Sequence, residues 1–226
     1  MEILLEAKNL YKEYSKTTGF FSRTRTSIKA LDNISLNIKK GITLAVVGES
    51  GSGKSTLAKS LIRLVEIDKG SIIFKNRNMR TISGVELKAT RKNIQMIFQD
   101  PYASLNPRMK IINIMEEPLK IHGIGDPVTQ YSKILSIVKK VGLAEEDLLK
   151  YPHQFSGGQR QRIGIARALI LEPELVICDE PVSALDVSVQ AQIIQLLKSL
   201  QKEFGLTYLF ITHDLRIVRH IANEVI

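Results

Sequence analysis

Residues 48–56 read GESGSGKST, which places glycines, hydroxyl side chains and one lysine together. The spacing of Gly48, Gly53, Lys54 and Ser55 fits the phosphate-binding pattern G-x-x-x-x-G-K-[ST]. Glycines let backbone N–H groups approach an anion, lysine adds a positive charge, and serine can bind Mg²⁺. A flexible linker is excluded because an apolar run precedes the stretch directly and a helical pattern follows it. We therefore predict a nucleoside-triphosphate cradle formed by Gly48, Glu49, Ser50, Gly51, Ser52, Gly53, Lys54, Ser55 and Thr56.

Two adjacent carboxylates end the apolar run LVICDE at residues 175–180. Charged groups at the end of a buried strand are costly unless a cation or a proton transfer uses them. Beside a phosphate cradle, Asp179 is expected to hold Mg²⁺ and Glu180 to polarise an attacking water. Two surface acids without a function are the alternative, and the neighbouring cradle makes that alternative less favoured.

A second potential anion site lies in FSGGQ at residues 155–159. Ser156 suits a helix N-cap, and Gly157 and Gly158 leave the N–H donors of the first turn exposed. One nucleotide does not need two cradles that are far apart in the sequence. A head-to-tail dimer explains both, with the second cradle of each subunit closing on the nucleotide of its partner.

Short apolar runs alternate with helical patterns along the chain. Buried strands are predicted at 43–48, 93–99, 174–180 and 207–212, and helices at 54–65, 158–171 and 187–204. This alternation predicts an α/β fold of the P-loop NTPase type with a mostly parallel sheet. Residues 3–38 suggest an N-terminal antiparallel β subdomain. We expect one domain over 1–226, with an α/β core at about 1–85 and 166–226 and an inserted α-helical subdomain at about 86–165.

The composition is that of a globular chain, with 226 residues, 44% hydrophobic content and a net charge of +9. The lysines and arginines are mostly scattered, which favours a solvated basic surface over a nucleic-acid groove. The single cysteine, Cys178, excludes an internal disulfide and is expected to be a small buried hydrophobe. No apolar run approaches the roughly 20 residues of a membrane span, and the N-terminus lacks the layout of a secretory signal, so a soluble chain is expected.

The order of GESGSGKST, FSGGQ, LVICDE, SALD (183–186) and ITHD (211–214) resembles the nucleotide-binding subunits of ATP-binding cassette (ABC) transporters. Together these motifs span nearly the whole chain. The resemblance implies ATP and Mg²⁺ as ligands. It implies that Gln99 senses Mg²⁺ and the γ-phosphate, that His213 contacts the γ-phosphate, and that Asp186 couples the two sites of a dimer. Ser156, Gly157, Gly158 and Gln159 would act on the nucleotide of the partner. The adenine-stacking aromatic matches Tyr14, with Tyr11 as the alternative, and Phe155 stands where many members have leucine.

FQDPYASLNPRM (98–109) and YPHQFSGGQRQRIGIARAL (151–169) are similar to importers of the oligopeptide, dipeptide and nickel group. The stretch 19–36 resembles an extended first hairpin of that group. The resemblance implies a second ABC ATPase subunit, in a homo- or heterodimer, two permease subunits and, indirectly, an extracellular solute-binding protein. It places the chain peripherally on the cytoplasmic face of the cell membrane. Peptides are the first choice of cargo, with nickel and oligosaccharides behind. Family members usually continue beyond the position of NEVI (223–226), and a C-terminal extension is not found in this sequence.

Two other classes of function compete with transport. An ABC-type ATPase acting on nucleic acid or ribosomes would suit the basic charge. Such proteins usually carry coiled-coil insertions or two cassettes, neither of which is seen here, and no nucleic-acid partner is expected. A P-loop kinase or GTPase would leave FSGGQ and SALD without a role. ATPase activity stimulated by DNA or RNA, and not by a permease pair, would favour the first alternative.

Overall fold

The computed structural model describes residues 2–18 and 24–226, and its centre is a five-stranded sheet. The strand order is β6 (Ile94–Ile97), β7 (Leu175–Asp179), β8 (Thr207–Thr212), β3 (Thr43–Val47) and β9 (Glu224–Val225). All four neighbouring pairs are parallel. The carboxyl ends of the strands therefore lie at the same edge of the sheet, where the loops that follow them can meet.

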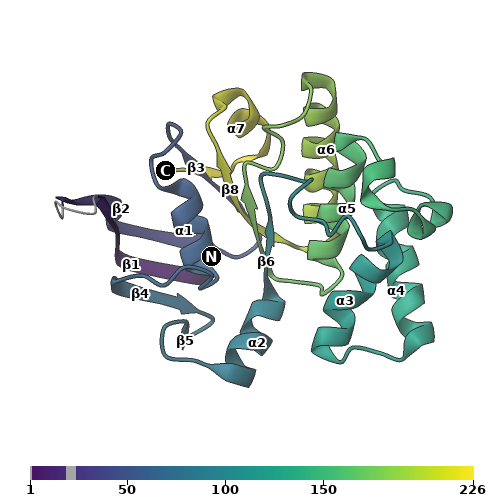
Figure 1. Ribbon diagram of the computed structural model, residues 1–226, viewed down its shortest axis with the longest axis horizontal. Helices are drawn as coiled ribbons and strands as arrows, with labels where there is room; N and C mark the ends of the chain where they lie inside the picture. Colours follow the sequence, from purple (N-terminus) through teal and green to yellow (C-terminus); the bar gives the residue numbers. More distant parts are fainter. Residues whose placement is uncertain (1, 19–23) are drawn as a thin grey trace.

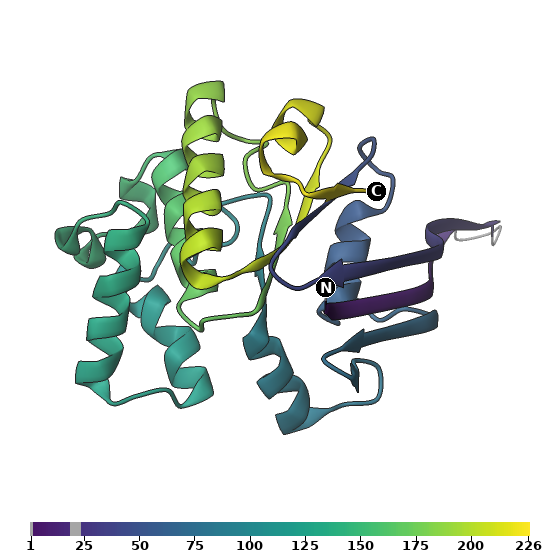
Figure 2. The same ribbon diagram turned by 180° about the vertical axis from the view of Figure 1, so that it is seen from behind.

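A four-stranded antiparallel sheet lies beside the parallel one. Its order is β2 (Thr24–Lys39), β1 (Ile3–Thr18), β4 (Lys69–Phe74) and β5 (Arg77–Asn78). Figures 1 and 2 show this sheet at one end of the molecule and helices α3 (Ile111–His122) and α4 (Pro127–Lys140) at the opposite end. The predicted antiparallel pair within residues 3–38 is thus confirmed. The similarity of 19–36 to an extended hairpin falls partly on residues 19–23, which lie outside the described residues.

The remaining helices connect or cover the strands. They are α1 (Lys54–Leu61), α2 (Gly84–Asn93), α5 (Gly157–Leu169), α6 (Val187–Phe204) and α7 (Leu215–Ile221), with 3-10 turns at Glu145–Leu149 and Pro152–Gln154. Helix α1 ends four residues before the predicted limit of 65, because Arg63 adopts a left-handed conformation with φ 56°. Its guanidinium donates hydrogen bonds to the carbonyls of Met79 and Ile82, which holds this turn against β5 and the residues that follow it.

The two faces of the parallel sheet form two hydrophobic cores. In β7, Leu175 and Ile177 face a core shared with α1 and the antiparallel sheet, whereas Val176 and Cys178 face a core shared with α3 to α6. This follows from the alternation of side chains along a strand, and it requires apolar residues at positions 175–178 of β7, before the strand ends at Asp179. Cys178 is fully buried, and burial raises the pKa of its thiol above the ordinary range. The predicted role of this cysteine as a buried hydrophobe agrees with these surroundings.

The division into an α/β core and a helical subdomain at 86–165 remains a prediction. Strand β6 lies inside that range and belongs to the parallel sheet, while α2 and α5 cross its two limits. The helices that pack away from the sheet begin with α3 at Ile111. Within the described residues, no helix is both long and apolar enough to cross a membrane.

Candidate active site

The loop between β3 and α1 wraps around the side chain of Lys54. The Lys54 Nζ atom donates hydrogen bonds to the carbonyls of Gly48 (2.7 Å) and Glu49 (2.6 Å), and lies 3.4 Å from Ser52 Oγ. Only 7% of Lys54 is exposed. Because an ammonium group has three donors, the loop satisfies this buried charge with its own oxygens. A phosphate entering the loop would replace neutral acceptors by an anion, which binds the ammonium more strongly.

Two glycines of the loop adopt conformations that other residues avoid. Gly51 has φ +83° and Gly53, the residue before α1, has φ +95°. A Cβ atom on Gly53 would lie 2.0 Å from the carbonyl oxygen of Ala30, so only glycine fits there. Ala30 has no register partner because Lys12 pairs with Leu31 and Glu13 with Lys29. This β-bulge in β2 brings the antiparallel sheet against the start of α1.

Asp179 lies at the carboxyl end of β7 and points to the start of α1. The Ser55 hydroxyl donates a hydrogen bond to Asp179 Oδ1 at 3.0 Å. Asp179 is only 3% exposed, and burial raises its pKa above the usual range for an aspartate. Among the residues that the structure describes, the Ser55 hydroxyl is the only side-chain hydrogen-bond partner of Asp179, so this buried carboxylate keeps a strong affinity for a cation. Together these two oxygens form a donor set that suits a hard divalent cation such as Mg²⁺.

The side chains of Gln99 and His213 both approach one carboxylate oxygen of Glu180. Glu180 Oε2 lies 3.3 Å from Gln99 Nε2 and 3.2 Å from His213 Nδ1. These residues follow the parallel strands β6, β7 and β8, whose carboxyl ends lie at the same edge of the sheet. Glu180 has φ 46°, and its N–H donates to the Ile211 carbonyl at 3.0 Å, which turns the chain sharply after β7.

These three side chains open onto a cleft beside the phosphate loop. The cleft has a volume of about 820 Å³ and is lined by Glu49, Ser50, Gln99, Asp100, Glu180, Ser183, Ala184 and His213. Glu180 is largely shielded, with 12% of its side chain exposed, whereas 55% of the His213 side chain is exposed. The cleft thus brings the loop, the carboxylate and an imidazole onto one shared space large enough for a polyphosphate.

The FSGGQ segment lies at the start of α5, outside the group of residues that line the cleft. Ser156 is the N-cap, as its position in the sequence predicts: its hydroxyl accepts from Gln159 N–H at 3.3 Å, and Gln159 Oε1 accepts from Ser156 N–H at 3.0 Å. Cβ atoms on Gly157 and Gly158 would approach Leu185 to 3.2 Å and Val189 to 2.5 Å. The glycines therefore permit close packing against the start of α6, while Ser156 and Gln159 stay exposed.

Asp186 precedes α6 and is exposed, and its side chain makes no capping hydrogen bond. The two candidate tyrosines differ in their surroundings. Tyr14 is 44% exposed, with the Lys12 ammonium 5.4 Å from its ring centroid. Tyr11 is half-buried, and its hydroxyl donates to Glu13 Oε2 at 2.9 Å, which raises the pKa of the phenol. Of the two rings, Tyr14 offers the freer face.

Comparison with known proteins identifies the family. A family model described as ABC transporter matches residues 31–183. This chain belongs to the ABC transporter family. It is 51% identical over 225 residues to the oligopeptide transport ATP-binding protein AppF of Bacillus subtilis, covering 99% of this chain and 68% of that protein. It is 52% identical over 229 residues to OppF of Haemophilus influenzae, also an oligopeptide transport ATP-binding protein, covering 100% of this chain and 69% of OppF.

A solved structure agrees with the fold of this ABC subunit. The dimeric ATP-binding cassette MJ0796, in a post-hydrolysis state bound to ADP and phosphate, matches with a TM-score of 0.82 at 33% identity. The match covers 96% of this chain and 91% of that cassette. The ABC subunit is accordingly an ATP-binding and ATP-hydrolysing chain with the α/β fold predicted for a P-loop NTPase.

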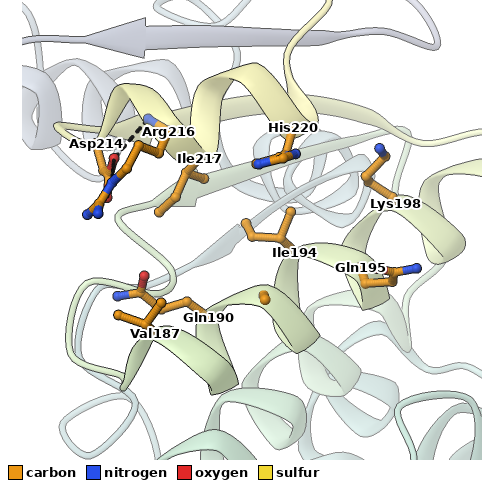
Figure 3. A pocket seen from close by; sticks show the side chains of 10 residues that line it. Val187, Gln190, Ile194, Gln195, Lys198, Asp214, Arg216, Ile217 and His220 are labelled. Atoms are coloured by element: carbon orange, nitrogen blue, oxygen red, sulfur yellow. Dashed lines mark hydrogen bonds and ion pairs between the residues drawn. The ribbon is translucent and has the colours of Figure 1, made fainter.

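The sequence did not indicate one polar pair of this ABC subunit, Asp214 and Arg216. Asp214 caps the short helix α7: Oδ1 accepts from Arg216 N–H at 2.8 Å, and Oδ2 accepts from Arg216 Nη2 at 2.7 Å. Figure 3 shows this pair at one end of a groove between α6 and α7. The hydrogen bonds from Arg216 lower the pKa of Asp214 to about 2. Because Asp214 directly follows His213, the cap fixes the turn that carries the imidazole; an aspartate just before a short helix was the available signal.

Proposed function

We propose that this ABC subunit drives the import of oligopeptides or dipeptides by binding Mg²⁺ and ATP between its phosphate loop and the FSGGQ segment of a second subunit. The observation that carries the proposed chemistry is the convergence of Gln99 and His213 on Glu180 Oε2. The peptide class is supported by the relatives AppF and OppF, which are oligopeptide transport ATP-binding proteins. The working location that follows is the cytoplasmic face of the membrane, on a permease pair.

Different residues are assigned to the phosphate end and to the adenine end of the nucleotide. Lys54 and the backbone N–H groups of residues 48–56 would hold the β- and γ-phosphates, with the dipole of α1 adding to the attraction. Ser55, Gln99 and Asp179 would hold Mg²⁺, and Gln99 would also sense the γ-phosphate. When bound, Mg²⁺ would neutralise charge on the phosphate oxygens. Tyr14 would stack on adenine.

Hydrolysis is assigned to Glu180 as general base. A water in the cleft would attack the γ-phosphorus while its proton passes to a Glu180 oxygen, and the bond from the γ-phosphorus to the bridging oxygen of ADP breaks. ADP and inorganic phosphate are released. Gln99 and His213 would hold the carboxylate by its Oε2 atom and leave Oε1 free to face the water. Such positioned proton transfer typically accounts for about 10²–10⁴-fold in rate.

The partner subunit is expected to complete each site. Ser156, Gly157, Gly158 and Gln159 of one chain would cover the γ-phosphate held by the other, and Asp186 would link the two sites. Their separation from the cleft in this chain supports that assignment. MJ0796, which has the same fold, is dimeric with ADP and phosphate bound. ATP then favours the closed dimer through contacts that ADP lacks, and this difference would move the permease.

A groove on another face is proposed to receive the permease. Its volume is about 290 Å³, and its lining includes Leu64, Phe98, Pro118 and Ile121. Leu64 and Ile121 are each more than half exposed although apolar. Phe98 is the neighbour of Gln99, so a partner seated in the groove lies one residue from a side chain that contacts Glu180. This continuity supports a mechanical link between the permease and the catalytic carboxylate.

The dimer and the cargo are tested separately. The Glu180→Gln chain with Mg²⁺ and ATP, alone and with a candidate second subunit, should double in mass in light scattering only when ATP is present. Reconstitution with the neighbouring permease pair and its binding protein should give ATP-dependent uptake of a labelled peptide. Uptake of nickel or an oligosaccharide in place of peptide, or ATPase activity stimulated only by DNA or RNA, would overturn the proposed cargo.

The groove is tested by charge substitution. Leu64→Glu and Ile121→Glu should reduce recovery of the permease with the ATPase subunit, while ATP affinity of the isolated chain stays unchanged. Leu149→Glu, at an apolar residue 67% exposed outside the groove, is the matched control and should assemble normally. Equal recovery of all three variants would exclude this groove as the docking site.

A further inference from the structure

We propose that Asp68 is a positioning residue for nucleotide binding, which acts by holding Lys12 against the ring of Tyr14 and by pinning β1 beside the phosphate loop. Asp68 lies in the connection from α1 to β4, outside every motif of the nucleotide site. The inference rests on the proposed stacking of adenine on Tyr14. It adds to that proposal a residue that holds the Tyr14 ring in position for adenine.

Asp68 closes the free edge of β1 at the place where β4 ends. The last register pair between β1 and β4 is Tyr11 with Lys69. Beyond that pair, Asp68 takes the place of a strand residue: its N–H donates to the Tyr11 carbonyl at 2.8 Å, and its Oδ2 accepts from Glu13 N–H at 2.8 Å. A single residue thus satisfies both a carbonyl and an amide of β1 that would otherwise face solvent.

The second carboxylate oxygen of Asp68 holds a lysine. Oδ1 accepts from Lys12 Nζ at 2.9 Å, and only 17% of the Lys12 side chain is exposed. The same ammonium lies 5.4 Å from the Tyr14 ring centroid, within the range of a cation–π contact. The hydrogen bonds from Glu13 and Lys12 lower the pKa of Asp68, so the carboxylate is ionised at neutral pH. The Lys12 ammonium is therefore held by Asp68 at the distance at which it contacts the Tyr14 ring.

The pinned section of β1 is also the section that meets the phosphate loop. Opposite Lys12 and Glu13, β2 forms the bulge at Ala30, and the Ala30 carbonyl packs against Gly53. Tyr14 pairs with Ile28, two residues from that bulge. Asp68 on one edge and Ala30 on the other hold the same stretch of β1. The position of the Tyr14 ring relative to the phosphate loop is consequently defined from both sides.

The test separates recognition of the base from recognition of the phosphates. Dissociation constants for ATP and for inorganic triphosphate, both with Mg²⁺, are measured by calorimetry on the full chain. Asp68→Asn keeps the shape of the side chain and removes its charge, and Lys12→Met keeps the apolar stem. Each should weaken ATP roughly threefold to tenfold, the size of a cation–π contact, and leave triphosphate unchanged. Asp32→Asn, whose partner Lys29 is 3.4 Å away on the same hairpin, is the matched control and should change neither.

Double variants test whether Asp68 acts through Tyr14. In the Tyr14→Ala background, which should itself weaken ATP roughly fivefold or more, Asp68→Asn should have no further effect. Equal weakening of ATP and triphosphate by Asp68→Asn would overturn the inference, since Asp68 would then only shape the loop. No effect of Asp68→Asn, with a clear effect of Tyr14→Ala, would also overturn it while the role of Tyr14 stands. If Tyr14→Ala leaves ATP binding intact, the proposed stacking fails and the inference fails with it.

Discussion

The Nδ1 atom of His213 lies 3.2 Å from Oε2 of Glu180, and Gln99 donates to the same oxygen. Gln99 therefore holds one oxygen of the carboxylate, and the His213 ring lies beside the same oxygen. The other oxygen, Oε1, has no hydrogen-bond partner among the residues that the structure describes. It therefore remains free for a water in the cleft, as the general-base role that we propose for Glu180 requires.

Glu180→Gln should keep ATP binding and lose most turnover. The amide has the same shape but cannot accept the proton, so the kcat of the partnered protein should fall roughly 10²-fold or more while the Kd for ATP stays within about twofold. Steady-state phosphate release and calorimetry measure the two quantities. Glu172→Gln, at an exposed acid paired with Lys133, is the control and should keep the parental rate. Hydrolysis by Glu180→Gln at the parental rate would refute the assignment.

Lys54→Ala should abolish tight ATP binding. Its ammonium is buried in the phosphate loop, and a lost charge-assisted hydrogen bond network typically costs about 1.5–3 kcal/mol, or roughly 10-fold to 150-fold in Kd. Lys40→Ala, at a lysine outside the loop, should bind ATP normally. Calorimetry with Mg²⁺ and ATP compares them. An unchanged Kd for Lys54→Ala would show that the loop does not bind the phosphates.

Gly53→Ala should destabilise the nucleotide-free chain more than Gly51→Ala. Both positions have positive φ, so each alanine incurs backbone strain of about 1 kcal/mol or more. Only the alanine at 53 would also collide with the Ala30 carbonyl, whereas a Cβ at 51 meets open space. The thermal unfolding midpoint should therefore be lower for Gly53→Ala. Equal midpoints would mean that the bulge at Ala30 does not press on the loop.

Asp179→Asn should raise the stability of the nucleotide-free chain at neutral pH. Burial raises the folded pKa of Asp179 above its ordinary value of 3.8, so the folded chain holds the proton more tightly than the unfolded chain. The stability that Asp179 contributes is thus present below about pH 4 and lost as pH rises through the folded pKa. The midpoint of the variant relative to the parent should increase with pH, while Mg²⁺-dependent ATP binding is lost. If the difference in midpoint between the variant and the parent does not change with pH, the prediction is wrong.

Asp214→Asn should change the stability of the chain in the opposite direction at neutral pH. Arg216 lowers the folded pKa of Asp214 to about 2, so its contribution is present at neutral pH and lost only as pH falls through that value. The variant should unfold at a slightly lower temperature than the parent at pH 7, the effect being small because 83% of the Arg216 side chain is exposed. A rise in the midpoint at neutral pH would exclude a stabilising role for this pair.

Features that depend on neighbours in the chain were predictable from the sequence. The glycines and lysine of 48–56, the N-cap at Ser156 and the buried strand that ends at Asp179 are local patterns of residue type and spacing. The helix at 187–204 and the strand at 207–212 have the predicted bounds. Local patterns survive folding because the backbone conformation of a turn or cap is determined within a few residues.

Contacts between distant segments were decided only by the tertiary structure. Before the family resemblance is used, nothing local in Gln99 or His213 indicates that both reach the same oxygen of Glu180. Their meeting follows from the order β6, β7, β8 in the parallel sheet. The bulge at Ala30 that excludes a side chain at Gly53, and the bonds from Asp68 to β1, likewise need the antiparallel sheet in place. The sequence by itself determined the candidates for binding phosphate and transferring a proton; strand order and register decided which of them touch, because those depend on packing across the whole chain.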